Sequence, residues 1–240
     1  MSLHSSAPKT SPYYEDDFVT LYHGNCLELQ DYWLDADVLV TDPPYGMAYV
    51  SNSSKHKGKT AAIAGDGDTS IRDAALAAWG NRPGLAFGTW RTPKPASTRL
   101  MLTWDKGVSP GMGDLALPWG ISTEEIYVLG KWPAIKPGGR VREGGTPSRA
   151  ASVVRIDTLN SQAIDRPDHP TPKPVPLMER LIEKCPPGVI TDPFAGSGAT
   201  LVAAKNLGRR VIGVELEERY CEIIAKRCAQ EVLDIFGGAA

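Results

Sequence analysis

Four consecutive residues, Asp42-Pro43-Pro44-Tyr45, combine the groups needed to hold a planar amino group. They directly follow an apolar, β-branched run at 37–41, which is typical of a strand buried on both faces. Neither proline has an N–H and both have fixed φ angles, so the Asp42 carboxylate and the Pro43 carbonyl are acceptors held side by side. Such a pair suits an NH₂ group, and Tyr45 offers a ring on which a heterocycle can stack. The segment indicates a base-binding site; a plain turn is the alternative.

A glycine-rich turn at 192–198 (DPFAGSG) forms a second candidate binding element between a strand and a helix. Glycines there let the backbone approach a ligand closely and direct amide groups at it. About twenty residues on, the strand 211–215 ends in Glu215, where a carboxylate can accept hydrogen bonds from ribose hydroxyls. A dinucleotide-binding fingerprint would need a glycine three residues after Gly198, where Leu201 stands. The pattern therefore favours a nucleoside cofactor over a dehydrogenase dinucleotide, with a tight turn without ligand as the alternative.

The remaining segments predict the elements that must position these two turns. Strands are expected at 18–22, 37–41, 84–88, 99–104, 124–129, 189–191 and 211–215, with a short one near Val153. Helices are expected in a stretch ending near Trp33 and at 71–79, 174–185, 197–207 and 217–236. The strand–turn–helix–strand order near the end of the chain implies a parallel sheet. We therefore expect a doubly wound α/β fold with its ligands at the carboxyl ends of the strands.

The composition restricts the class of protein but does not identify a function. A chain of 240 residues and 25.8 kDa fits one substantial domain, and 42% hydrophobic and 22% charged residues are ordinary for a globular protein. No apolar run approaches the length of a membrane helix, and 1–17 lacks the pattern of a secretion signal, so a cytoplasmic protein is expected. The four cysteines lack zinc-site spacing, and Cys221 and Cys228, two helical turns apart, predict buried packing. Reduced thiols and no metal are expected.

The two turns together resemble the motifs of S-adenosylmethionine-dependent DNA methyltransferases that modify exocyclic amines, N6 of adenine or N4 of cytosine. DPPY at 42–45 is similar to the catalytic motif of this family, and FAGSG at 194–198 to its cofactor loop. Their order, catalytic motif first, resembles the circularly permuted β group. Further similar segments are LYHGNCL at 21–27, WDK at 104–106, TEEIYVLGK at 123–131, HPTPKP at 169–174 and LGRRVIGVELEERYCEIIAKR at 207–227.

This resemblance implies a fold and a division of the chain. It implies a mostly parallel, seven-stranded, Rossmann-like methyltransferase sheet in circularly permuted order. A polar tail at 1–17 would precede a single domain at 18–240. Within that domain, a mobile loop at 46–70 and an irregular target-recognition insertion at 131–168 are expected.

The resemblance also assigns roles at the two turns. Asp42, Pro43, Pro44 and Tyr45 would hold the target base. The residues implied for S-adenosylmethionine are Asn25, Cys26, Asp42, Thr171, Lys173, Asp192, Pro193, Phe194, Gly196, Ser197, Gly198 and Glu215. Within this set, Asn25 and Cys26 would contact the adenine ring and Glu215 the ribose. Asp192 would lie near the methionine part, and Thr171 and Lys173 would meet the methionine carboxylate. The family more often has an acid where Asn25 stands, and His169 would only orient the turn before Lys173.

The implied reaction methylates DNA, as in restriction–modification, with double-stranded DNA as partner, no membrane, and a homodimer left open. A target base inside a duplex is inaccessible, so it would be flipped out. A net charge of −2 requires any DNA-binding surface to be local. The expected DNA contacts are Lys55, Lys57 and Lys59 in the loop and Lys136, Arg140, Arg142 and Arg149 in the insertion. Each could instead be a solvated surface charge.

Adenine is favoured as the target because DPPY is the commoner adenine form in the family. N4-cytosine methylation is the first alternative, and methylation of an RNA base or a protein amide is less favoured because no RNA-binding module is visible. A DNA-binding protein without catalysis is a third reading. The intact residues Asp42, Tyr45, Gly196, Gly198 and Glu215 argue against it.

Overall fold

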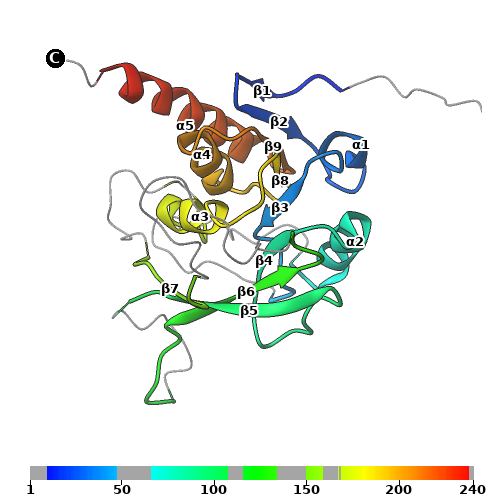
Figure 1. The fold of residues 1–240 in the computed structure, drawn as a ribbon, viewed down its shortest axis with the longest axis vertical. Helices are drawn as coiled ribbons and strands as arrows, with labels where there is room; N and C mark the ends of the chain where they lie inside the picture. Colours follow the sequence, from blue (N-terminus) through cyan, green and yellow to red (C-terminus); the bar gives the residue numbers. More distant parts are fainter. Residues whose placement is uncertain are drawn as a thin grey trace, which may run out of the picture.

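The structure is a computed structural model that describes residues 10–47, 66–107, 116–133, 150–158, 167 and 169–237, and side chains up to 230 (Figure 1). Its strands are β1 (Tyr14–Glu15), β2 (Val19–His23), β3 (Val38–Thr41), β4 (Gly84–Gly88), β5 (Thr98–Asp105), β6 (Thr123–Leu129), β7 (Val153–Arg155), β8 (Ile190–Asp192) and β9 (Val211–Glu215). Its helices are α1 (Gln30–Trp33), α2 (Ser70–Trp79), α3 (Val175–Ile182), α4 (Ala199–Asn206) and α5 (Glu218–Gly237).

One mixed sheet organises the chain, with the strand order β1-β2-β9-β8-β3-β4-β6-β5-β7. The five strands from β2 to β4 in this order run parallel to their neighbours. β6 runs antiparallel to both β4 and β5, β1 antiparallel to β2, and β7 parallel to β5. The mostly parallel α/β fold expected from the sequence is confirmed, but the described residues form a sheet of nine strands rather than seven.

The additional edge strand β1 lies inside the segment expected to be a polar tail. Asp16 explains why a strand forms there. Its carboxylate accepts hydrogen bonds from the backbone N–H groups of Phe18 at 2.9 Å and Val19 at 2.8 Å, which closes the turn between β1 and β2. Asp16 also forms an ion pair with the buried Lys205 of α4, with 2.5 Å between the charged atoms. A polar residue thus fixes the sheet edge through contacts that a local hydrophobicity pattern does not reveal.

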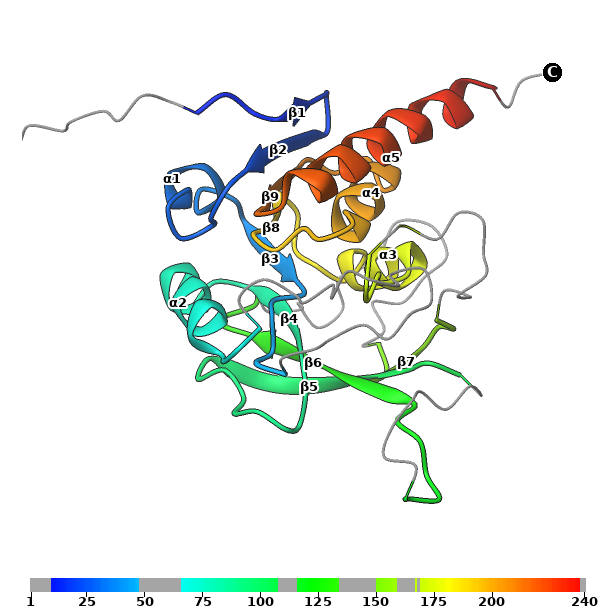
Figure 2. The same ribbon diagram turned by 180° about the vertical axis from the view of Figure 1, so that it is seen from behind.

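Helices cover both faces of the sheet, as Figures 1 and 2 show. Along β3, Val38 and Val40 pack into the hydrophobic cluster that contains residues of α3, α4 and α5. The residue between them, Leu39, packs into the opposite cluster with Trp33 of α1 and Trp79 of α2. Successive side chains of a strand point to opposite faces, so this alternation places one core on each side of β3. The doubly wound arrangement is confirmed.

This topology brings the two predicted turns to one edge of the sheet. β3 ends at Thr41, β8 at Asp192 and β9 at Glu215, and all three strands run in the same direction. Their carboxyl ends therefore meet, and the Thr41 hydroxyl donates a hydrogen bond of 2.6 Å to the Asp192 carboxylate. No helix among the described residues has the length and apolar character to cross a membrane.

Candidate active site

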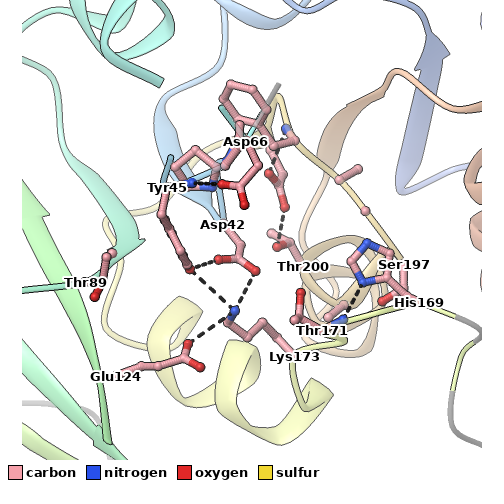
Figure 3. Close-up of a pocket in the computed structure, with 18 of the residues that line it drawn as sticks. Asp42, Tyr45, Asp66, Thr89, Glu124, His169, Thr171, Lys173, Ser197 and Thr200 are labelled. Atoms are coloured by element: carbon pink, nitrogen blue, oxygen red, sulfur yellow. Dashed lines mark hydrogen bonds and ion pairs between the residues drawn. The ribbon is translucent and has the colours of Figure 1, made fainter. Parts of the chain in front are cut away.

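A cavity of ≈ 830 Å³ opens at the carboxyl ends of these strands, a size suited to a small organic ligand (Figure 3). The wall includes most of the residues predicted for the target base and the cofactor: Asn25, Cys26, Asp42, Pro43, Pro44, Tyr45, Thr171, Lys173, Asp192, Pro193, Phe194, Gly196, Ser197 and Glu215. Gly198 is the predicted residue that does not line it. With φ +81°, it precedes α4, and a Cβ there would lie 2.9 Å from Ile224 of α5. Gly198 therefore permits close helix packing behind the cavity.

Asp42 lies at the centre of a compact polar group (Figure 3). Lys173 Nζ is 2.6 Å from Asp42 Oδ2 and 3.3 Å from Glu124 Oε2. The hydroxyl of Tyr45 donates a hydrogen bond to the other oxygen of Asp42. Lys106 Nζ lies 2.5 Å from Oε1, the other oxygen of the Glu124 carboxylate. Two carboxylates and two ammonium groups therefore balance one another in the wall of the cavity.

Burial dominates the ionisation of this group. It raises the pKa of Asp42 above its ordinary value, although the charge of Lys173 opposes the rise. For Glu124, burial would also raise the pKa, but Lys173 and Lys106 together hold it below the ordinary value. Lys173 is buried as well, and its two carboxylate partners raise its pKa. The structure thus places the Lys173 ammonium against carboxylates of the chain, where the resemblance implied a ligand carboxylate.

Asp66 holds the turn that follows the two prolines. Its Oδ1 accepts hydrogen bonds from the backbone N–H groups of Tyr45 at 2.8 Å, Gly46 at 2.8 Å and Met47 at 3.2 Å. Three successive amides directed at one carboxylate oxygen fix the backbone from which the Tyr45 ring projects. Asp66 is buried, and it lies within the segment that was expected to be a mobile loop. Hydrogen bonds from Gly46 and Met47 to Asp66 therefore join the two described ends of that segment.

Glu215 organises the glycine-rich turn. One oxygen accepts a hydrogen bond of 2.7 Å from Gly196 N, and the other accepts one of 2.8 Å from Glu217 N. Burial raises the pKa of Glu215 to about 7, although these two backbone donors favour its ionised form. Each carboxylate oxygen retains lone-pair capacity, and Glu215 lines the cavity, so it can still accept hydrogen bonds from hydroxyls. The carboxylate both shapes the turn and remains available to a ligand.

Asp192 is satisfied largely by neighbouring hydroxyls. Its two oxygens accept hydrogen bonds of 2.6 Å from Thr41 and of 2.6 Å from Thr200, and Phe194 N donates to it at 3.1 Å. Burial raises its pKa to about 6 against these stabilising bonds. Asp192 therefore ties β3, β8 and α4 together at the base of the cavity.

His169 orients the segment that leads to Lys173, as expected. Its Nδ1 accepts a hydrogen bond of 3.2 Å from Thr171 N, and its ring packs edge-on against Tyr220 with 4.7 Å between centroids. Asn25 has a local role as well, because its side-chain oxygen accepts a hydrogen bond of 3.0 Å from Leu27 N. That oxygen therefore caps the turn before α1 in addition to lining the cavity.

The expected DNA contacts Lys55, Lys57, Lys59, Lys136, Arg140, Arg142 and Arg149 lie outside the described residues. The four cysteines are all described and free, and Cys221 and Cys228 are buried, as their spacing predicts. Searched across the described part of the chain, His, Cys, Asp and Glu form no cluster of three or more that could hold a metal ion.

Sequence reasoning missed Glu124 and Asp66 as parts of the site. Glu124 belongs to the TEEIYVLGK segment, and an acid at the start of a strand otherwise rich in apolar residues is a usable signal. Asp66 carries a weaker signal, since Ala-Gly-Asp-Gly-Asp at 64–68 also fits an ordinary solvated loop. Both residues reach the site only through the order of the strands and the return of the chain after the Asp42–Tyr45 turn.

Comparison with known proteins agrees with this geometry. Residues 119–226 match the sequence model of a family described as DNA methylase, of the N6 and N4 type. The chain is 26% identical over 264 aligned residues to the type II methyltransferase M.ScaI of Streptomyces caespitosus, and the alignment covers 94% of this chain and 86% of that protein.

Solved structures share the fold. The M1.HpyAVI–SAM complex superposes with a TM-score of 0.56 at 23% identity, covering 88% of this chain and all of that one. The PvuII DNA methyltransferase, titled cytosine-N4-specific, superposes with a TM-score of 0.58 at 15% identity, covering 95% and 94% of the two chains. The chain is thus similar to a DNA methylase family of the N6 and N4 type over residues 119–226 and to a type II methyltransferase over most of its length, and the solved structures share its fold.

Proposed function

We propose that this protein transfers a methyl group from S-adenosylmethionine to the exocyclic amine of a flipped base in DNA, with N6 of adenine as the favoured target. The observation that carries the proposal is that the Asp42–Tyr45 turn and the Gly196–Glu215 contact line the same cavity. A donor site and an acceptor site that share one cavity can hold the two reactants in contact, which supplies a large part of a transfer rate.

The cofactor half of the cavity suits a nucleoside with an amino-acid tail. Glu215 offers a buried carboxylate at the end of β9 for ribose hydroxyls, and the backbone around Gly196 comes close to the ligand. Cys26 and Phe194 supply apolar surface for a ring. When bound, S-adenosylmethionine supplies a methyl group already activated by its sulfonium.

The target half suits a planar amine. The lone pair of an exocyclic amine is delocalised into the base, so the amine is a poor nucleophile. Hydrogen bonds from the amine to Asp42 and to the Pro43 carbonyl favour a pyramidal nitrogen with an available lone pair, and Tyr45 stacks on the base. Lys173 keeps Asp42 in its ionised, accepting form, because a buried carboxyl without a cation would tend to protonate.

N6 of adenine and N4 of cytosine are both exocyclic amines, so either group fits the same hydrogen-bond acceptors. The DPPY form of the motif favours adenine, while the similar fold of a cytosine-N4-specific enzyme keeps N4-cytosine as the second candidate. For the duplex we propose contacts from Lys55, Lys57 and Lys59 and from Lys136, Arg140, Arg142 and Arg149. Alanine at a phosphate contact would reduce the salt slope of binding, whereas alanine at a base contact would relax one position of the recognition sequence.

Incubation with labelled cofactor and mixed-sequence DNA, followed by mass spectrometry of the nucleosides, tests the proposal and separates the two bases. Asp42→Ala should lower the single-turnover rate by about 10²–10³, the cost of one preorganised hydrogen-bonding group at the reacting atom. Cofactor binding should largely remain, which shows that the variant is folded. Near-normal transfer by Asp42→Ala would make the turn structural and the proposal wrong.

Tyr45 has a different expected signature. Tyr45→Ala should impair holding of the flipped base by ~1–3 kcal/mol, and Tyr45→Phe, which keeps the ring, should be mild. A mismatched target that flips easily should partly rescue Tyr45→Ala but not Asp42→Ala. Equal rescue of both variants would contradict the separate roles.

A further inference from the structure

An exposed tryptophan marks one rim of the cavity. Trp90 follows β4, whose carboxyl end lies beside that of β3 and hence beside Asp42. The residue is 71% exposed, yet it lines the cavity together with its neighbour Arg91, whose guanidinium carbon lies 5.4 Å from the indole centroid. Large aromatic side chains usually contribute to stability by burial, so an indole held in solvent at a binding cavity indicates a binding surface.

The backbone under Trp90 is firmly anchored. Arg72 of α2 is only 1% exposed, and its guanidinium donates hydrogen bonds to the Pro93 carbonyl at 3.0 Å and to the Thr92 hydroxyl at 3.4 Å. The Tyr127 hydroxyl of β6, which donates its proton to the Glu125 carboxylate, lies 3.2 Å from the Thr89 carbonyl. The buried Arg72 side chain thus fixes the loop, although the largest side chain of that loop, Trp90, is mostly exposed. Such preorganisation lowers the ordering cost of binding.

The charge of this segment identifies the kind of partner. Residues 89–94 (TWRTPK) contain two cations and no acid, and Arg91 and Lys94 are both exposed. An exposed aromatic ring beside exposed cations matches a nucleic acid, which offers base faces for stacking and phosphates for pairing. Trp90 and Arg91 line the same cavity as Asp42 and Tyr45, which would hold the flipped base.

We propose that Trp90 and Arg91 form a docking edge for duplex DNA, an inference that rests on the proposed function. Trp90 stacks on a base adjoining the extruded nucleotide and compensates for the stacking lost there. Arg91 pairs with a backbone phosphate on the same side. Both residues belong to the described part of the chain, and the docking edge is distinct from the contacts proposed in the loop and the insertion.

The test compares Trp90→Ala with Trp119→Ala. Trp119 is 80% exposed but does not line the cavity, so it controls for loss of an exposed indole. Methyl transfer is measured with labelled cofactor and a mixed-sequence duplex, and DNA binding is measured by fluorescence anisotropy of the same duplex. Trp90→Ala should lower kcat/KM for DNA about 5- to 150-fold, equivalent to ~1–3 kcal/mol for one stacked base, with cofactor affinity unchanged. Trp90→Phe should retain most of the activity, and Arg91→Ala should reduce the salt slope of binding by about one.

The docking edge would be overturned if the DNA affinity and kcat/KM of Trp90→Ala stayed within twofold of wild type, or if Trp90→Ala and Trp119→Ala lost equally. A single-stranded RNA that bound better than the duplex, and lost affinity with Trp90→Ala, would also overturn it in favour of RNA. Absence of methyl transfer by the wild type would contradict the proposed function instead. Anisotropy with the duplex would then still decide the role of Trp90, because it does not depend on transfer.

Discussion

Lys173 Nζ lies 2.6 Å from Asp42 Oδ2, although the two residues are 131 positions apart in the chain. Lys173 also contacts Glu124, so one buried ammonium serves two carboxylates at the cavity wall. Removing one partner of a buried ion pair leaves an uncompensated charge, which costs far more than the pair itself contributes. The ionisation of the proposed catalytic carboxylate therefore depends on a residue from a distant segment.

Lys173→Met tests this dependence. Asp42 would lose its counter-ion, and burial would then raise its pKa further, because the charge and the hydrogen bond of Lys173 both oppose that rise. If Asp42 acts as a carboxylate, the acidic limb of the kcat/KM profile should move to higher pH. The variant should also unfold about 3–5 kcal/mol more easily at neutral pH. Between the pKa values of Asp42 in the unfolded and folded states, the folded state binds more protons. The free energy of unfolding of the variant should therefore fall as the pH rises through this range.

Lys106→Met is the matched control, because Lys106 pairs with Glu124 and not with Asp42. Its pH–rate profile should move less than that of Lys173→Met. Identical profiles for the two variants would show that Lys173 acts through the general field of the site rather than through Asp42.

Asp66 is expected to position the catalytic turn. Asp66→Ala leaves three backbone N–H groups without their acceptor, so the Tyr45 ring should lose its fixed orientation. Misplacement of about 1 Å can cost ~10² in rate, and we expect a loss approaching that value in single-turnover transfer, with cofactor affinity retained. Asp66→Asn keeps an acceptor oxygen and should recover much of the rate. Asp68→Ala is the control, because it removes a nearby exposed acid that accepts a hydrogen bond from Ser70 N. If Asp68→Ala lowered the transfer rate as much as Asp66→Ala, the positioning role of Asp66 would be refuted.

Cofactor affinity should depend on the ionisation of Glu215. Burial raises the pKa of this carboxyl to about 7, and only its ionised form accepts hydrogen bonds with both oxygens. The dissociation constant for S-adenosylmethionine should therefore rise as the pH falls, by up to about tenfold between pH 8 and pH 6 for a single coupled proton. Calorimetry at both values provides the measurement. Glu215→Gln should remove this component of the pH dependence.

Glu215→Ala should weaken binding at pH 8 by about 1–3 kcal/mol, because the ribose hydroxyls would lose their acceptor. An affinity equal to that of wild type, in a folded variant, would place the ribose elsewhere in the cavity.

Gly196 tests the cofactor turn by its shape. Its φ of +53° disfavours side chains, and an added Cβ would lie 3.2 Å from His169 Nε2 at the cavity. Gly196→Leu should therefore reduce cofactor affinity sharply. Gly208→Ala offers a control for backbone strain, because Gly208 has a φ of +64° with open space around its Cβ position. Both variants should lose about 1–2 kcal/mol of stability from the left-handed backbone, but Gly208→Ala should bind the cofactor normally.

Local sequence determined the elements that carry the two turns. The strand at 211–215 was predictable to the residue because an apolar β-branched run ends there in an acid, after a helix and a short turn. The strand at 84–88 was predictable for a similar reason, since it is a short apolar run bounded by glycines. Periodicity and turn chemistry depend on neighbours in the chain, so both can be read without the fold.

Only the tertiary structure decided which charges meet. The family resemblance implied that Lys173 meets the carboxylate of a ligand, but the order of the strands placed Asp42 and Glu124 around it. Asp66 belongs to a segment with the composition of a solvated loop, yet it holds the backbone of Tyr45. The physical reason is that hydrogen bonds and ion pairs depend on distances of a few ångström, and residues far apart in sequence reach such distances only when the sheet has assembled.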